Sequence, residues 1–121
     1  MKLTISALAL AGLIFTQAEA APSPRPATYS VWGVGVSSCG NWTDTSPAAN
    51  STKFLMLSWL QGYLSAYNNY VDHGGNVAKG TDIPGIIAWM DNYCHAHPLD
   101  NVATASDALM QALKAEKASH P

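Results

Sequence analysis

The sequence predicts a small all-α protein: a bundle of about three helices with an irregular N-terminal arm and one disulfide. Two observations carry this prediction. Apolar residues recur every three or four positions in three separate stretches, which is typical of helices that bury one face. The chain also has two cysteines, Cys39 ahead of the first helical stretch and Cys94 near the end of the second. We therefore expect one small hydrophobic core, to which a disulfide attaches the arm.

The first twenty residues predict a signal peptide. Lys2 precedes an apolar run from Leu3 to Phe15, and small residues follow, with cleavage expected after Ala20. The run is too short to span a bilayer as a helix. Residues 21–28 (APSPRPAT) are rich in proline and predict a spacer, and residues 29–118 are expected to form a single helical domain. The mature protein is thus expected to be periplasmic or secreted.

Export places the two thiols where disulfides persist, so we expect a bond between Cys39 and Cys94. Because two cysteines permit one intramolecular pairing, no thiol is left over. Chain-entropy arithmetic for a loop of about 55 residues gives roughly 4 kcal/mol of stabilisation. That value is comparable to the net stability of a small domain.

The first helix is expected to begin near Asn50-Ser51-Thr52, a cluster of good N-caps, and to end at His73-Gly74-Gly75. Gly62, inside this helix, costs about 1 kcal/mol relative to alanine, which predicts close packing of another backbone there. A small-residue stripe accompanies it (Ser58, Gly62, Ser65 and Ala66).

The second helix is expected to be capped by Asp82 and stopped by Pro98, with Cys94 on its buried side. The third is expected to be capped by Asp100, and Lys117 near its end complements the helix dipole. The glycine-rich segment Tyr29–Trp42 is expected to lie across the helices as an arm.

Composition argues against several classes of function. Charged residues make up 12% of the chain and the formal net charge is −2, which gives no electrostatic case for binding nucleic acid or an anionic membrane. The carboxylates are scattered, with no pair resembling an acid/base couple, and no serine lies in a recognisable nucleophile turn. Asp91 and His95, four residues apart, could pair on the second helix. We therefore expect no enzyme activity and no cofactor.

The segment Cys94-His95-Ala96-His97 suggests a metal site, since thiolate and imidazole are zinc ligands. It is disfavoured because Cys94 is the expected disulfide partner, and because residues 95 and 97 point in different directions on a helix. No metal is expected. Asn41-Trp-Thr and Asn50-Ser-Thr match the glycosylation sequon, which matters only in a host that glycosylates.

The aromatic residues are the candidate binding site. Trp59, Tyr63 and Tyr67 are apolar in body and polar at the tip, so they suit a half-buried face. Trp and Tyr concentrate in protein–protein interfaces, and Trp89 lies beside the apolar stripe of its helix and could project outward. These four residues are the predicted protein-binding surface; the alternative is that they belong to the core.

The stretch from Ile83 to Pro98 (IPGIIAWMDNYCHAHP) resembles the second-cysteine helix of the HdeA/HdeB acid-stress chaperones, in which a helix ends in tyrosine-cysteine with proline shortly after. Cys39 and Cys94 match the cysteine frame of that family. The resemblance implies a small exported helical protein whose homodimer loosens in acid and holds unfolded clients. It also implies that His73, His95, His97 and the few carboxylates sense pH.

A second resemblance is to the Tai-type immunity proteins, which block secreted cell-wall-degrading enzymes. It is carried by Gly62-Tyr63-Leu64 and by His97-Pro98 with the amphipathic helix that follows. It implies an inhibitor that plugs the cleft of one partner enzyme. The two alternatives share a non-enzymatic protein-binding role and no membrane span in the mature chain.

Overall fold

The structure, a computed structural model, describes residues 29–119 and shows the all-α fold that the sequence predicts. Its helices are α1 (Cys39–Thr43), α2 (Asn50–Tyr70), α3 (Ile83–Ala96) and α4 (Val102–Ser119), with 3-10 turns η1 (Gly33–Val36) and η2 (Pro47–Ala49). Between residues 29 and 119 there is no β-strand, and Ser38 and Asn101 form an isolated bridge. The predicted signal peptide and spacer, residues 1–28, lie outside the described residues.

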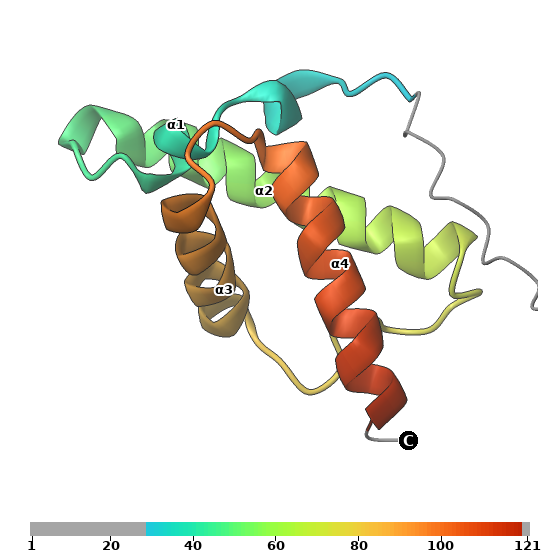
Figure 1. Cartoon of the computed structure of the whole chain (residues 1–121). Helices are drawn as coiled ribbons and strands as arrows, with labels where there is room; N and C mark the ends of the chain where they lie inside the picture. Colours follow the sequence, from blue (N-terminus) through green and yellow to red (C-terminus); the bar gives the residue numbers. More distant parts are fainter. Residues whose placement is uncertain (1–28, 120–121) are drawn as a thin grey trace, which may run out of the picture.

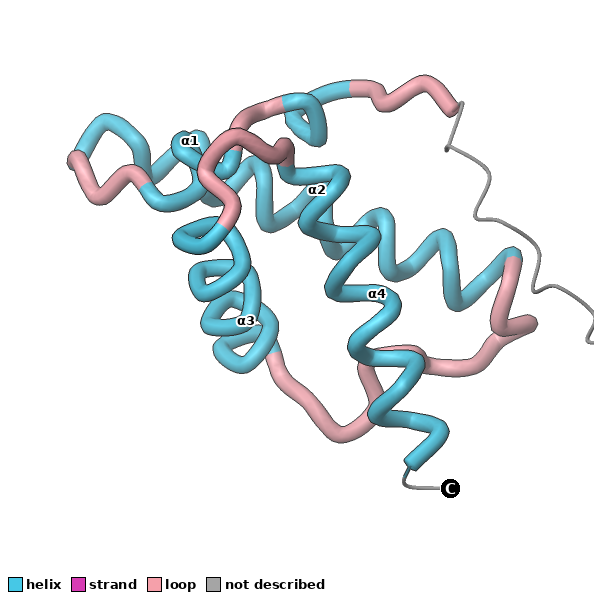
Figure 2. Tube along the Cα trace, in the orientation of Figure 1, coloured by secondary structure: helices cyan, strands magenta, loops and turns pink. Residues whose placement is uncertain are grey.

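Helix α4 packs against both α2 and α3, and the N-terminal arm crosses over α2 and α4 (Figure 1). The loop between α2 and α3 runs past the C-terminal half of α4 (Figure 2). The core lies where these helices meet and takes apolar side chains from each: Met56, Leu60 and Leu64 of α2, Ile86 and Met90 of α3, and Val102, Leu109 and Met110 of α4. Burial of these faces is the main source of stability.

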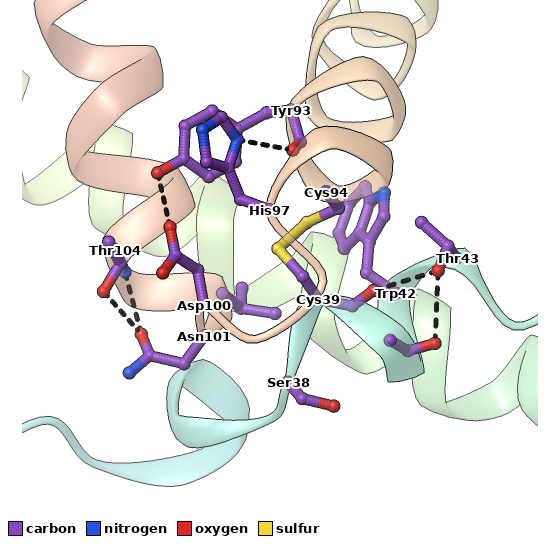
Figure 3. The surroundings of a disulfide bond; sticks show 12 residues. Ser38, Cys39, Trp42, Thr43, Tyr93, Cys94, His97, Asp100, Asn101 and Thr104 are labelled. Atoms are coloured by element: carbon purple, nitrogen blue, oxygen red, sulfur yellow. Dashed lines mark hydrogen bonds between the residues drawn. A yellow bond between two sulfur atoms is a disulfide. The ribbon is translucent and has the colours of Figure 1, made fainter.

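Helix α1 lies inside what the sequence predicted to be irregular arm, and it ties the arm to the bundle. Its first residue, Cys39, is bonded to Cys94 of α3, with Cα atoms 4.8 Å apart, so the predicted disulfide is confirmed. Trp42 of α1 is fully buried against the core. The Cys39 N–H also donates to the Asp100 carbonyl at 2.8 Å. Figure 3 shows the short helix and the α3–α4 turn meeting around the sulfur atoms.

Two of the three expected helix caps are wrong. No side chain caps α2: the turn η2 leads straight into it, so the chain is already helical when it reaches Asn50. At α4 the cap is Asn101, whose Oδ1 accepts from the Thr104 N–H at 2.8 Å, and Asp100 binds elsewhere. The prediction for α3 is confirmed, because Asp82 accepts from the Gly85 N–H at 2.8 Å.

Gly62 does not mark a close approach of another backbone, so that prediction is wrong. The residue is exposed, and a Cβ built on it would meet nothing within 4 Å. Helix α2 ends at Tyr70, and the turn that follows uses left-handed backbone at His73 (φ 47°) and Gly74 (φ 91°). A glycine adopts this conformation without a Cβ penalty, as expected of a helix terminus.

Candidate functional site

Large apolar side chains are exposed along the arm and the first half of α2. Four of them are Trp32 (83% exposed), Val36 (62%), Phe54 (68%) and Leu55 (54%). Leu55 lies one turn before Trp59 on α2, and Trp32 and Val36 flank the arm backbone that covers Trp59. We call Trp32, Val36, Phe54, Leu55 and Trp59 together the arm–α2 surface. Phe54 and Leu55 also line a shallow hollow at the start of α2, with Asn50 and Ser51.

Trp59 is the anchor of the arm. Its indole Nε1 donates to the carbonyl oxygen of Trp32 at 2.8 Å. The backbone of Gly35 lies so close to the ring that an added Cβ would come within 2.5 Å of Trp59 Cζ2. A glycine is therefore required at this point of contact. The arm therefore contacts Trp59 through its backbone at Gly35, while the side chain of Val34 packs against the core.

A second attachment of the arm is a carboxylate shared by two tyrosines. The Tyr29 hydroxyl donates to Asp107 Oδ2 at 2.7 Å, and the Tyr63 hydroxyl donates to Asp107 Oδ1. Desolvation and the hydrogen bond to Asp107 raise the pKa of Tyr29 to about 12, and the same causes raise the pKa of Tyr63 well above its usual range. The two phenols therefore stay protonated and keep donating into alkaline pH, and their hydrogen bonds join the arm, α2 and α4.

The structure brings three of the four predicted binding residues together. Trp59 and Tyr63 stack with ring centroids 5.8 Å apart, and Tyr67 follows one turn later; all three are half-buried against the core. Trp89 lies apart from them on α3, where it stacks on Tyr93 at 5.4 Å and lines a separate groove beside α4. The four residues therefore belong to two surfaces rather than one.

A polar cluster around Asp91 was not predicted from the sequence. Its Oδ1 accepts from the buried indole Nε1 of Trp42 at 2.7 Å and from Lys53 Nζ at 2.9 Å. The Lys53 ammonium also lies 5.3 Å from the centroid of the Trp42 ring. Asp91 thus links α1, α2 and α3, and these are the bonds it makes in place of the expected pair with His95. Separations of 49 and 38 residues explain why spacing alone could not reveal them.

The cysteine–histidine segment has a structural role. Cys94 is in the disulfide, and within residues 29–119 no three His, Cys, Asp or Glu side chains gather to hold a metal ion. His97 stacks on Tyr93 at 4.3 Å, and the Tyr93 hydroxyl donates to Asp100 Oδ2 at 2.8 Å (Figure 3). Burial and this hydrogen bond raise the pKa of Tyr93. The ladder Trp89–Tyr93–His97 therefore supports the α3–α4 turn.

Comparison with known protein families, curated proteins and solved structures finds no match to this chain. Among residues 29–119, none of the helices has the length and apolar character needed to cross a membrane. The resemblance to HdeA/HdeB proteins thus stays a prediction.

Proposed function

We propose that this protein is an exported, non-enzymatic binding module that holds apolar segments of unfolded proteins, as the HdeA/HdeB resemblance implies. The observation that carries the proposal is the arm–α2 surface, where Trp32, Val36, Phe54 and Leu55 are more than half exposed. A cluster of exposed apolar side chains on a small domain is typical of a protein-binding site. Tyr63 and Tyr67 continue this surface along α2 from Trp59 once the arm moves.

The carboxylates support a binding role rather than catalysis. Asp107 is engaged by two tyrosines, Asp91 by Trp42 and Lys53, Asp72 by Lys117, and Asp100 by Tyr93. Each of them therefore fastens parts of the chain to one another. A general acid or base needs a free path to a substrate proton.

Contacts of carboxylates hold the arm and the helices together. Asp91 and Asp72 form ion pairs with Lys53 and Lys117, at 2.9 Å and 2.7 Å. Asp107 accepts hydrogen bonds from Tyr63 of α2 and from Tyr29 at the start of the arm. Acid destabilises folded proteins whose carboxylates are paired in this way, and the proposal is that acid loosens the arm and uncovers Trp59 and Tyr63. A homodimer that shields this surface at neutral pH is part of the proposal.

The test is suppression of aggregation of an acid-unfolded dehydrogenase at about pH 3, where carboxylates become protonated. The double variant Phe54→Ser/Leu55→Ser is expected to lose most of the protection, while Leu99→Ser keeps it. Leu99 is the matched control because it is 97% exposed and lies in the α3–α4 turn, outside the arm–α2 surface. No protection by the wild type, or equal protection by both variants, contradicts the proposal.

The inhibitor role implied by the Tai-type resemblance predicts a different result. Cross-linking in periplasmic extract at neutral pH would then yield one stoichiometric partner, a cell-wall hydrolase, whose activity falls on binding. A client holder instead yields many partners, and mainly in acid. One extract treated at both pH values separates the two roles.

A further inference from the structure

A groove distinct from the arm–α2 surface lies between α3, the C-terminal half of α4 and the α2–α3 loop. Its volume is about 820 Å³, within the range of small-molecule sites, roughly 300–1,000 Å³. Trp89 forms the α3 wall, Leu109 and Leu113 form the α4 wall, and Val77 closes the loop side. The floor is therefore apolar.

The groove is held open by fixed contacts rather than by mobile side chains. The Val77 N–H donates to Asn68 Oδ1 at 2.8 Å, which fixes the loop on α2. Lys117 binds Asp72 at 2.7 Å across the loop, and Trp89 is held by its stack on Tyr93. A preformed apolar site costs little ordering when a ligand enters.

The charge on the rim selects the ligand. Lys79 lies on the rim, is exposed, and its ammonium has no side-chain partner within the part of the chain that the structure describes. Thr81 beside it adds a hydroxyl, while Glu116 lies on the α4 rim next to Lys117. Two of the lysines among residues 29–119 line this groove; the full set is Lys53, Lys79, Lys114 and Lys117. The Lys79 ammonium above an apolar floor fits a ligand with one anionic group at the end of an apolar chain.

We propose that this groove binds a monocarboxylate with an apolar chain, a free fatty acid of medium length, with its carboxylate at Lys79 and its chain against Trp89, Leu109 and Leu113. The site goes beyond the proposed client binding and uses none of the arm–α2 residues. Failure of either proposal therefore leaves the other standing.

The experiment is titration of the full mature protein with decanoate and with decanol, followed by the indole N–H resonance of Trp89, which Trp89→Phe identifies. Decanoate is expected to bind saturably at one site and to shift this resonance. Ala112→Phe, which places a ring in the groove, is expected to abolish binding. Circular dichroism of this variant verifies that it folds.

The role of Lys79 is tested by Lys79→Met against Lys114→Met, a lysine on α4 that does not line the groove. Lys79→Met is expected to weaken decanoate binding roughly fivefold, the size of an exposed ion pair, and to leave decanol unaffected. Lys114→Met is expected to change neither. The proposal is overturned if decanoate shows no saturable binding, if folded Ala112→Phe binds normally, or if Lys79→Met and Lys114→Met behave alike. It is equally overturned if only phospholipid vesicles or an apolar peptide shift the Trp89 resonance.

Discussion

Replacement of Gly35 by alanine tests how the arm is seated. The new Cβ would lie 2.5 Å and 2.7 Å from two atoms of the Trp59 ring and 2.8 Å from Val31 Cγ1. The ring cannot yield freely, because it donates to the Trp32 carbonyl and stacks on Tyr63. Gly35 has no positive φ, so the backbone itself accepts alanine. The loss of stability on substitution therefore comes from the steric clash of the new Cβ with Trp59 and Val31.

We expect Gly35→Ala to lower the free energy of unfolding by about 2 kcal/mol, in the range of overpacking substitutions. For a domain of this size that corresponds to a fall in Tm of about 10 °C. Thermal unfolding by circular dichroism measures the loss. Tryptophan emission and binding of an apolar dye report whether Trp59 is uncovered.

The matched control is Gly62→Ala, at an exposed glycine of α2, the helix that also carries Trp59. A Cβ at Gly62 meets nothing within 4 Å, so the substitution is expected to stabilise by about 1 kcal/mol through helix propensity. If Gly35→Ala were as stable as the wild type with unchanged emission, the arm would not be seated on Trp59 as described.

Three further predictions concern the disulfide and the hydrogen bonds that join distant segments of the fold. Cys39→Ser/Cys94→Ser is expected to lower the unfolding free energy by about 4 kcal/mol, measured in urea; an unchanged midpoint would contradict it. Asp91→Ala, which leaves the buried Trp42 indole without its acceptor, should cost about 2 kcal/mol, and Asp91→Asn less. The folded state raises the pKa of Tyr29 to about 12 from its ordinary 10.0. The Tyr29–Asp107 hydrogen bond therefore contributes fully to stability below pH 10.0, and this contribution is lost as the pH rises through about 12. Asp107→Asn should return the Tyr29 titration toward 10.0, as followed by tyrosine NMR.

Local patterns in the sequence predict the helices because burial of one face leaves a visible period. They predict the disulfide because a chain with two cysteines permits one intramolecular pairing. The cap at Asp82 follows from the same local logic. These features depend on residues close together in the chain or on a count.

Several of the errors come from tertiary contacts. Asn101 rather than Asp100 caps α4, because the Asp100 side chain accepts a hydrogen bond from the Tyr93 hydroxyl. The backbone carbonyl of Asp100 accepts from the Cys39 N–H. The Asp91 and Asp107 clusters each join distant segments, so neither leaves a spacing signal. Trp89 separates from Trp59 because α3 and α2 present them on different surfaces. Tertiary contacts decide such details, and a single sequence does not display them.

The central claim, that clients bind on the arm and the first half of α2, is tested most directly by photo-cross-linking. A photoreactive side chain is placed at Phe54 in one sample and at Leu99 in another, both exposed positions, and each is irradiated with an acid-unfolded dehydrogenase. We expect adducts from position 54 that increase in acid, and few adducts from position 99. Equal yields from the two positions, or none from position 54 while the client is protected, would contradict it.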